Sequence, residues 1–508
     1  MIKRTSFSLI HYAFSVLIVC IAFATIVVDK NIDSAFPNTV AYPNAVYYLI
    51  AAVVFWVIVC LQKKFTHADI SNKAYMVMML TVPCVIFVFW QIPVSRWIYW
   101  FATPSDFGSI MYASMGLNNG QNFADWPYFL QSPNNANISI AMSWLYKIVP
   151  NWKGIILIGA LLTNLSAVLA ALSVKNITKN RYTSIVTLVL AEILMGMNWR
   201  SFLVYTDNYN MIFVALIFWA FTLEIRDGHK FFAVTFFSAI GTFIKPTALI
   251  GYLSILIFCF LNLISNEKTK ILLKVKKGLS MLVVMSVVFG TMIAGQNALR
   301  SYYGLDLEGQ YPKGWQYMLM VGQNDKYYGV TNSDDPQIRE EYIAQAQAQN
   351  EDVSYVNNKL LEEGLSRILN RGIWGNIKFY VGKLNVAYND GYFHNLQVYP
   401  PSASHELKQN LLYQLLWKDG GNLYQVSAGV FQTVWDMVLL SLMAGIVVFR
   451  KRDFPKVLEL CILGVTLYLM LFEGRSKYLY MFLPVYLMTA GASLQYFLDI
   501  INTPKIKT

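Results

Sequence analysis

The sequence predicts an all-α polytopic membrane protein with about twelve transmembrane helices, interfacial helices and a mixed extracytoplasmic domain. Of its 508 residues, 56% are hydrophobic and only 14% are charged, whereas roughly a quarter are charged in an average soluble protein. The apolar residues gather in runs close to the roughly 20 residues that cross a hydrocarbon layer about 30 Å thick. The short loops between these runs are rich in Lys and Arg, and the longer ones are acidic.

Hydropathy fixes the approximate position of each span. We place them near residues 7 to 28, 45 to 61, 74 to 92, 154 to 174, 182 to 198, 209 to 224, 231 to 244, 247 to 264, 279 to 296, 426 to 449, 457 to 472 and 478 to 498. The predicted domains are a transmembrane module (1–296) with a catalytic external loop (93–153), an extracytoplasmic domain (297–425) and C-terminal transmembrane helices (426–508).

The charged loops predict the sidedness. By our count, 21 of the 40 Lys and Arg residues lie in short loops, which the positive-inside rule assigns to the cytoplasm together with both termini. The net charge of +11 is therefore a topology signal, with a further attraction to anionic lipid of the bilayer, and it does not indicate a nucleic-acid partner. The five cysteines all fall inside predicted spans, so no disulfide framework is expected.

One short stretch decides the topology that follows it. Lys245-Pro246 interrupts the apolar sequence of residues 231 to 264. A single crossing here would place Lys268 to Lys277 outside, against the charge bias, so we predict two helices that meet at the Lys-Pro turn. Fourteen residues of helix rise only about 21 Å, which predicts a recessed turn with Lys245 at the rim of a cavity. Snorkelling at a helix end is the alternative for this lysine.

Asp106 is the candidate catalytic residue. It precedes a segment with helical spacing, Phe107 to Met115, and the structural alternative is a helix N-cap. Removing a proton from a hydroxyl requires a carboxylate where the substrate arrives, and a phosphate leaving group requires cations. Four basic residues are predicted to share its side of the membrane and to bind donor phosphate: Arg200, Lys245, Arg475 and Lys477.

Aromatic and amide side chains on the same side suggest sugar recognition, in which rings cover apolar faces and amides or carboxylates bind hydroxyls. The predicted substrate contacts are Asn134, Asn135, Trp315, Asp390 and Tyr478. We expect Asp335 to Asn370 to be a polar helical stretch. We expect Lys383 to Phe393, where aromatic residues are interspersed with Asn and Asp, to be part of this sugar-binding surface. His394 and His405 lack a carboxylate at helical spacing, so no metal pair is predicted.

Several of these segments together resemble the GT-C superfamily of integral-membrane glycosyltransferases, most closely the bacterial branch related to protein mannosyltransferases (family 39). The segments are external Asp106, Pro133-Asn134-Asn135, Ile244-Lys245-Pro246-Thr247, Trp315 to Gly322, Asn389-Asp390-Gly391 and Phe472-Glu473-Gly474-Arg475-Ser476-Lys477-Tyr478-Leu479. The superfamily commonly has Arg-Tyr where this chain has Ser476-Lys477-Tyr478. In many of its members the catalytic Asp follows the first span, whereas here two additional spans, which resemble an added hairpin, precede that helix.

The resemblance implies a polyprenyl-phosphate sugar donor, a cell-envelope glycan or polymer as acceptor, inversion at the anomeric carbon and an active site outside a bacterial plasma membrane. It implies Asp106 as the general base, and it leaves the use of a divalent metal open. Two other functions fit twelve spans: a polysaccharide polymerase or ligase that uses a polyprenyl-diphosphate glycan, and a secondary transporter. The scattered arginines of residues 297–425 disfavour the former, and the lack of a matched pair of interrupted helices disfavours the latter.

Overall fold

The computed structural model describes residues 2–28, 42–65, 70–96, 105–265, 271–393, 409–417 and 423–502. Within these ranges every regular element is helical and none is a strand, so the predicted mixed external domain is helical instead. His394, His405 and the lysines at 268 and 270 lie outside the described residues.

Seven helices are long and apolar enough to cross a membrane. They cover Lys3–Val27 in α1 (Ile2–Val27), Asn44–Lys64 in α2 (Asn44–Phe65), Asn72–Ser95 in α3 (Asn72–Ile86) with η1 (Phe87–Gln91) and α4 (Ile92–Ser95), α8 (Trp152–Thr178), Pro246–Ser265 in η7 (Pro246–Ala248) with α12 (Leu249–Ser265), α13 (Ile271–Tyr302) and α20 (Leu423–Val448). The protein is thus a helical membrane protein.

The other five predicted spans are helical too, but they are shorter or less apolar, so the count of twelve remains a prediction. They are α9 (Arg181–Ala191) with the π-helix η5 (Glu192–Gly196), α10 (Thr206–Thr222), α11 (Asp227–Ile244), α21 (Pro455–Leu471) and α23 (Leu483–Asn502). Helix α23 is buried along most of its length and packs against α8, α9, α20 and α21. A Cβ on Gly491 would lie 2.9 Å from Val174 of α8, so glycine permits this close crossing.

The Lys-Pro turn confirms the predicted helical hairpin. Thr235 and Tyr252 are 17 positions apart, yet their hydroxyl oxygens lie 3.1 Å from each other, whereas one continuous helix would separate them by about 26 Å. Helix α11 has 18 residues, however, and begins four residues before the predicted span. Its length of about 27 Å nearly equals the hydrocarbon thickness, so the prediction of a recessed turn, which assumed a helix of only 14 residues, is wrong.

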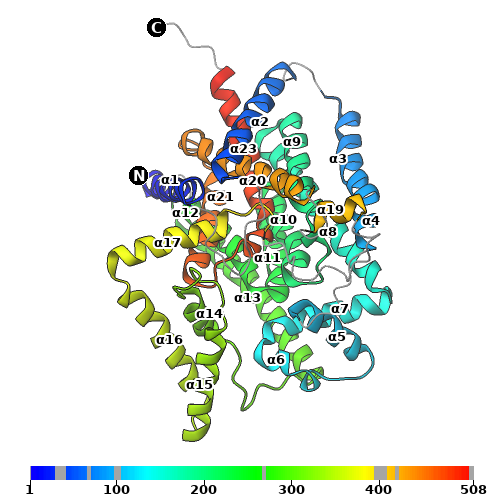
Figure 1. Cartoon of the computed structure of the whole chain (residues 1–508). Helices are drawn as coiled ribbons and strands as arrows, with labels where there is room; N and C mark the ends of the chain where they lie inside the picture. The colour runs from blue at the N-terminus through cyan, green and yellow to red at the C-terminus, as the bar shows by residue number, and fades with distance from the viewer. Residues whose placement is uncertain are drawn as a thin grey trace.

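The remaining helices are mostly short, and most of them gather at one end of the bundle, in the lower half of Figure 1. They comprise α5 (Asp106–Asn118), α6 (Pro127–Gln131), α7 (Ala136–Ile148), α14 (Trp315–Gly322), α15 (Asp334–Gln349), α16 (Val353–Asn370), α17 (Gly372–Tyr388), α19 (Leu411–Leu416) and α22 (Lys477–Tyr480). The polar stretch from Asp335 to Asn370 is therefore two helices, separated where Asn350 adopts a positive φ of 55°.

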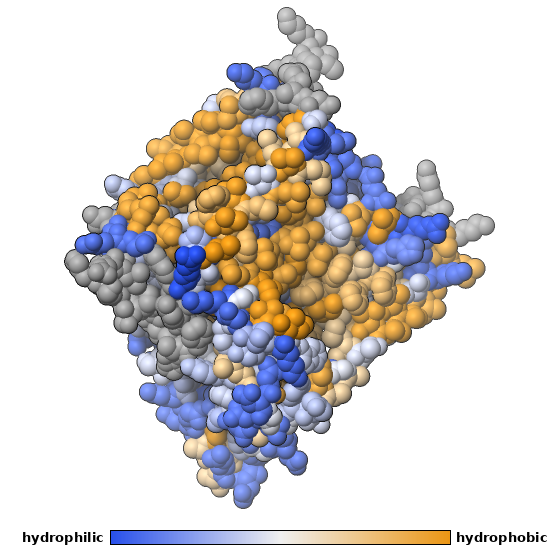
Figure 2. Space-filling model, turned by 90° about the vertical axis from the view of Figure 1, so that its right-hand side faces the viewer, coloured by the Kyte–Doolittle hydropathy of each residue, from blue (hydrophilic) through white to orange (hydrophobic). Residues whose placement is uncertain are grey.

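The surface carries the apolar belt expected of a membrane protein. Figure 2 shows a broad hydrophobic flank, with hydrophilic residues concentrated at the tip formed by α15 and α16. None of the residues of α13 is buried, and its large side chains, such as Leu272, Leu279 and Leu282, are exposed. Such a surface is stable in lipid and unfavourable in water.

Candidate functional site

Asp106 lies at the start of α5 with its carboxylate exposed. The helix is capped by Ser105, whose Oγ accepts a hydrogen bond from the Gly108 amide at 3.3 Å. The N-cap alternative for Asp106 is therefore wrong, because Asp106 is the first helical residue. Its Oδ2 instead accepts a hydrogen bond of 3.3 Å from the Tyr205 hydroxyl, which comes from the loop before α10.

A second tyrosine, Tyr128 of α6, also lies near Asp106. The Asn135 side-chain amide donates to the Tyr128 hydroxyl oxygen at 2.5 Å, and Asn134 donates to Asn135. Burial, reinforced by the negative charge of Asp106, raises the pKa of both Tyr128 and Tyr205. Both phenols thus stay protonated at neutral pH and act as hydrogen-bond donors around the Asp106 carboxylate.

Two lysines lie within electrostatic range of this carboxylate. Lys477 from the start of α22 and Lys313 from the loop before α14 are both half-buried. Within the part of the chain that the structure describes, neither ammonium group has an ion-pair or hydrogen-bond partner; Lys477 lies over the Tyr478 ring at 4.8 Å and Lys313 over the Tyr317 ring at 5.6 Å.

The pKa values of these lysines reflect burial and neighbouring charges. Burial lowers the pKa of Lys477, and the negative charges of Glu473 and, less strongly, Asp106 oppose this effect. Burial and the positive charge of Arg339 lower the pKa of Lys313, and Asp106 opposes this shift. One exposed carboxylate and two ammonium groups without a direct ion-pair partner therefore share one electrostatic environment. We define the candidate site as Asp106, Tyr128, Tyr205, Lys313 and Lys477.

Lys245 and Arg200, both predicted to bind phosphate, already have partners inside the protein. The Lys245 ammonium lies 2.5 Å from Oδ1 of Asp207, and their side chains are only 13% and 3% exposed. Arg200 is buried and donates to the Phe393 carbonyl at 3.1 Å. Burial lowers the pKa of Arg200, and Asp207 opposes this shift. Both residues border the candidate site as part of its frame.

The segment from Glu473 to Tyr478 is held by its own ion pair. Arg475 Nε lies 3.3 Å from Glu473 Oε1, and the hydroxyls of Thr331 and Tyr478 also donate to the Glu473 carboxylate. Burial disfavours ionisation of Glu473, but Lys477, Arg475 and the hydroxyl groups outweigh it and lower the pKa to about 2. Glu473 is thus a permanent anion that orients Arg475 beside Lys477.

A buried lysine fixes the base of the same segment. Lys383 of α17 donates to the carbonyls of Gly322, Met470 and Phe472, which end α14 and α21. A Cβ on Gly322 would lie 2.5 Å from the Phe472 carbonyl oxygen, so only glycine permits the two helix ends to meet. Lys383 and its neighbours Leu384, Asn385, Ala387 and Tyr388 are buried, so this part of the predicted sugar-binding surface is wrong.

The remaining predicted substrate contacts differ in position. Asp390 accepts a hydrogen bond of 2.7 Å from Ser476 and so lies next to the Glu473–Tyr478 segment. Trp315 is 56% exposed at the start of α14, and no described contact joins it to Asp106. Sequence reasoning missed Tyr128, Tyr205 and Lys313, since a tyrosine or lysine in a polar loop carries no local signal of its partner.

The described ranges contain no cluster of three or more His, Cys, Asp or Glu residues placed to hold a metal ion.

Comparisons with known proteins agree with the membrane architecture. A family model described as "Conserved hypothetical integral membrane protein" matches residues 2–497. No curated protein and no solved structure matches the sequence.

Proposed function

We propose that this chain is a glycosyltransferase. It belongs to the family described as "Conserved hypothetical integral membrane protein". It would transfer one sugar from a polyprenyl-phosphate donor to an extracytoplasmic glycan or polymer of the cell envelope, with inversion. The donor class comes from the resemblance to the GT-C superfamily, and the candidate site supplies the chemical support.

The observation that carries the proposal is that a carboxylate able to act as a base and basic side chains able to bind phosphate occur together in the candidate site. Asp106 is an exposed carboxylate with two phenolic donors to orient it, and neither Lys313 nor Lys477 has a direct ion-pair or hydrogen-bond partner among the described residues. A purely structural site pairs its charges, because an uncompensated, partly buried charge is unfavourable. Here three basic groups, Lys313, Arg475 and Lys477, stand against two carboxylates, Asp106 and Glu473, so one positive charge remains for an anionic ligand.

In the proposed reaction, the Asp106 carboxylate takes the proton of the acceptor hydroxyl. The acceptor oxygen attacks the anomeric carbon from the face opposite the phosphate, so a new C–O bond forms as the bond to the phosphate oxygen breaks. The polyprenyl phosphate leaves with both electrons of that bond and an additional negative charge. Lys477 and Lys313 stabilise this developing charge, as preorganised cations do in other transfer reactions.

The other predicted residues take supporting roles. Lys245 and Arg475 are each held by a carboxylate, and Arg200 by a backbone carbonyl. In the proposal they set the positive potential of the site and position Lys477, and the leaving phosphate meets Lys477 first. Asn135 orients Tyr128, and Asp390 and Ser476 fix the segment that carries Lys477.

The test is a comparison of envelope glycans from cells that lack the protein and from cells that express wild type, Asp106→Asn or Asp306→Asn at equal membrane levels. Asp306 is the matched control, since it is an exposed aspartate whose side chain accepts a hydrogen bond from the Glu308 amide. Null and Asp106→Asn cells should lack the same sugar substituent, while Asp306→Asn cells keep it.

Full modification in Asp106→Asn cells would refute the base assignment. A shortened glycan backbone in the null cells, with its substituents intact, would refute transfer of a single sugar. Asparagine at the first helical position removes an interaction with the helix dipole of only about 0.3–1 kcal/mol, so the variant should remain folded.

A further inference from the structure

A second site candidate lies at the opposite end of the α11–α12 hairpin from Lys245. A cavity of about 500 Å³ opens there between the first turns of α11, the last turns of α12 and the first half of α13. This volume falls within the roughly 300–1,000 Å³ typical of small-molecule sites. From Val234, the residue of its wall nearest the turn along α11, about 17 Å of helix lead to Lys245, so it is separate from the candidate site.

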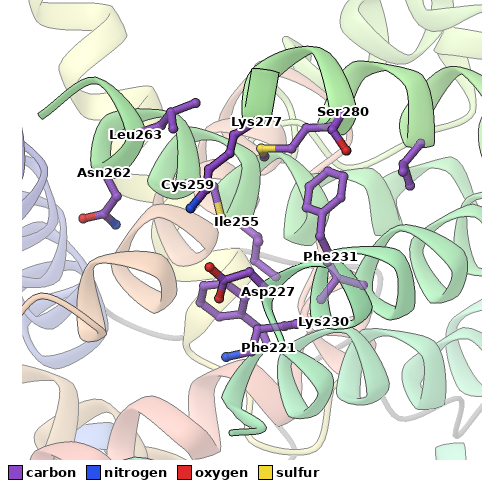
Figure 3. Close-up of a pocket in the computed structure, with 14 residues that line it drawn as sticks. Phe221, Asp227, Lys230, Phe231, Ile255, Cys259, Asn262, Leu263, Lys277 and Ser280 are labelled. Atoms are coloured by element: carbon purple, nitrogen blue, oxygen red, sulfur yellow. The ribbon is translucent and has the colours of Figure 1, made fainter. Parts of the chain in front are cut away.

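The cavity is amphipathic. One part of its wall is apolar and includes Phe231, Ile255 and Val284, and the other part carries Lys230 and Lys277. Figure 3 shows Lys277 on the helix opposite Asp227 and Lys230, with Phe231 and Ile255 next to these charged groups.

The two cavity lysines are in no direct ion pair within the described residues. Neither Lys230 nor Lys277 has an ion-pair or hydrogen-bond partner among the described residues; Lys230 lies over the Phe221 ring at 5.9 Å. They come from two different loops that the charge pattern assigns to the same side of the membrane. The single acid of the wall, Asp227, leaves a net positive charge. An anionic group therefore complements this end of the cavity.

The apolar part faces the lipid. Helix α13 has no buried residue, and Leu279, Leu282 and Val283 on its surface are 54–61% exposed. Helix α13 packs against α11 but makes few contacts with α12, so the cavity lies along a weakly packed boundary between α12 and α13 that a flexible hydrocarbon chain can enter from the bilayer. Filling that boundary adds the apolar contacts that α13 lacks.

We propose that this cavity binds an anionic phospholipid of the adjacent leaflet. The lipid phosphate lies between Lys230 and Lys277, and one acyl chain lies along Phe231, Ile255 and Val284. Asp227 accepts a hydrogen bond from a headgroup hydroxyl, which favours a glycerol headgroup over choline, since choline has no donor. The bound lipid fills the space between α13 and α12.

The experiment measures lipid binding to the purified full-length protein in detergent by native mass spectrometry, with phosphatidylglycerol and phosphatidylcholine as probes. Wild type should retain phosphatidylglycerol at least ten times more strongly than phosphatidylcholine. The double variant Lys230→Gln/Lys277→Gln should lose this preference. The matched control, Lys64→Gln/Lys73→Gln, removes two exposed lysines from another predicted loop of the same side and should keep it.

A second variant separates the cavity from general surface charge. Val284→Trp fills the apolar wall and leaves both lysines in place, so it should reduce phosphatidylglycerol binding at least fivefold. Equal losses in the cavity and control lysine variants, or undiminished binding in Val284→Trp, would overturn the proposal. Displacement of the lipid by inorganic phosphate alone would also overturn it, because the acyl chain would then contribute nothing.

Discussion

The buried pair of Lys245 and Asp207 gives a prediction whose size follows from the structure. Lys245→Met leaves the Asp207 carboxylate, 3% exposed, without the ammonium group 2.5 Å away, and its second oxygen, Oδ2, has no hydrogen-bond partner. Breaking a buried pair on one side costs about 3–5 kcal/mol. Because Arg200 also stabilises the negative charge of Asp207, we expect the lower end, about 3 kcal/mol.

The double variant isolates the interaction. In Asp207→Asn/Lys245→Met neither charge remains, so the loss of stability should be smaller than the sum of the two single losses by at least about 2 kcal/mol. Contacting residues in one ionic network show coupling of this order. The assay is equilibrium unfolding of the purified protein in mixed micelles with increasing SDS, followed by circular dichroism or tryptophan fluorescence.

Additive losses, within about 0.5 kcal/mol, would refute the reasoning. They would mean that Lys245 and Asp207 do not interact in the folded protein, and that Lys245 is available to a ligand as the sequence suggested.

The other predictions concern the segment that carries Lys477. Lys383→Met leaves three buried carbonyls without a donor, and each unsatisfied buried group costs about 1–3 kcal/mol of stability. The variant should therefore exchange the amide hydrogens of residues 473–477 faster than wild type. Unchanged exchange would contradict the role given to Lys383. Gly322→Ala forces a methyl group against the Phe472 carbonyl and should destabilise by at least about 1–3 kcal/mol, whereas Gly290→Ala, with open space around it, should be neutral or stabilising; similar melting of both variants would refute the close approach. The pKa of Glu473, about 2 in the folded protein against an ordinary 4.5, means that its ionised form stabilises the fold fully above pH 4.5 and loses this effect as the pH falls through 2. Glu473→Gln should therefore flatten the pH dependence of the SDS midpoint over that range, and an unchanged slope would contradict the shift.

Elements that depend only on neighbouring residues could be predicted from the sequence. Apolar runs of membrane length marked the helices, and Lys245-Pro246 marked the hairpin, since proline cannot continue a helix. Asp106 and Lys477 stood out as charges between spans. The break at Asn350 was also predictable in principle, because asparagine tolerates the left-handed conformation that ends a helix.

Long-range pairing decided the rest. Whether Lys245, Arg475 or Lys477 is neutralised depends on Asp207 and Glu473, and only the fold reveals which basic residue keeps its charge for a ligand. Lys383 shows the same limit: in sequence it resembles a surface lysine near aromatic residues, whereas in the structure it is buried among three carbonyls. Lys313 acquires its role only because the α14 region folds toward Asp106.

Asp106, as the base for the acceptor hydroxyl, and Lys477, as a cation for the donor phosphate, are proposed to act in one transfer reaction. The most direct measurement is sugar transfer by the purified protein from a radiolabelled polyprenyl-phosphate sugar to isolated envelope glycan. The account predicts transfer by wild type, no transfer by Asp106→Asn with the donor still bound, and a raised apparent donor KM for Lys477→Gln. Wild-type rates in Asp106→Asn, or an unchanged donor KM in Lys477→Gln, would contradict it.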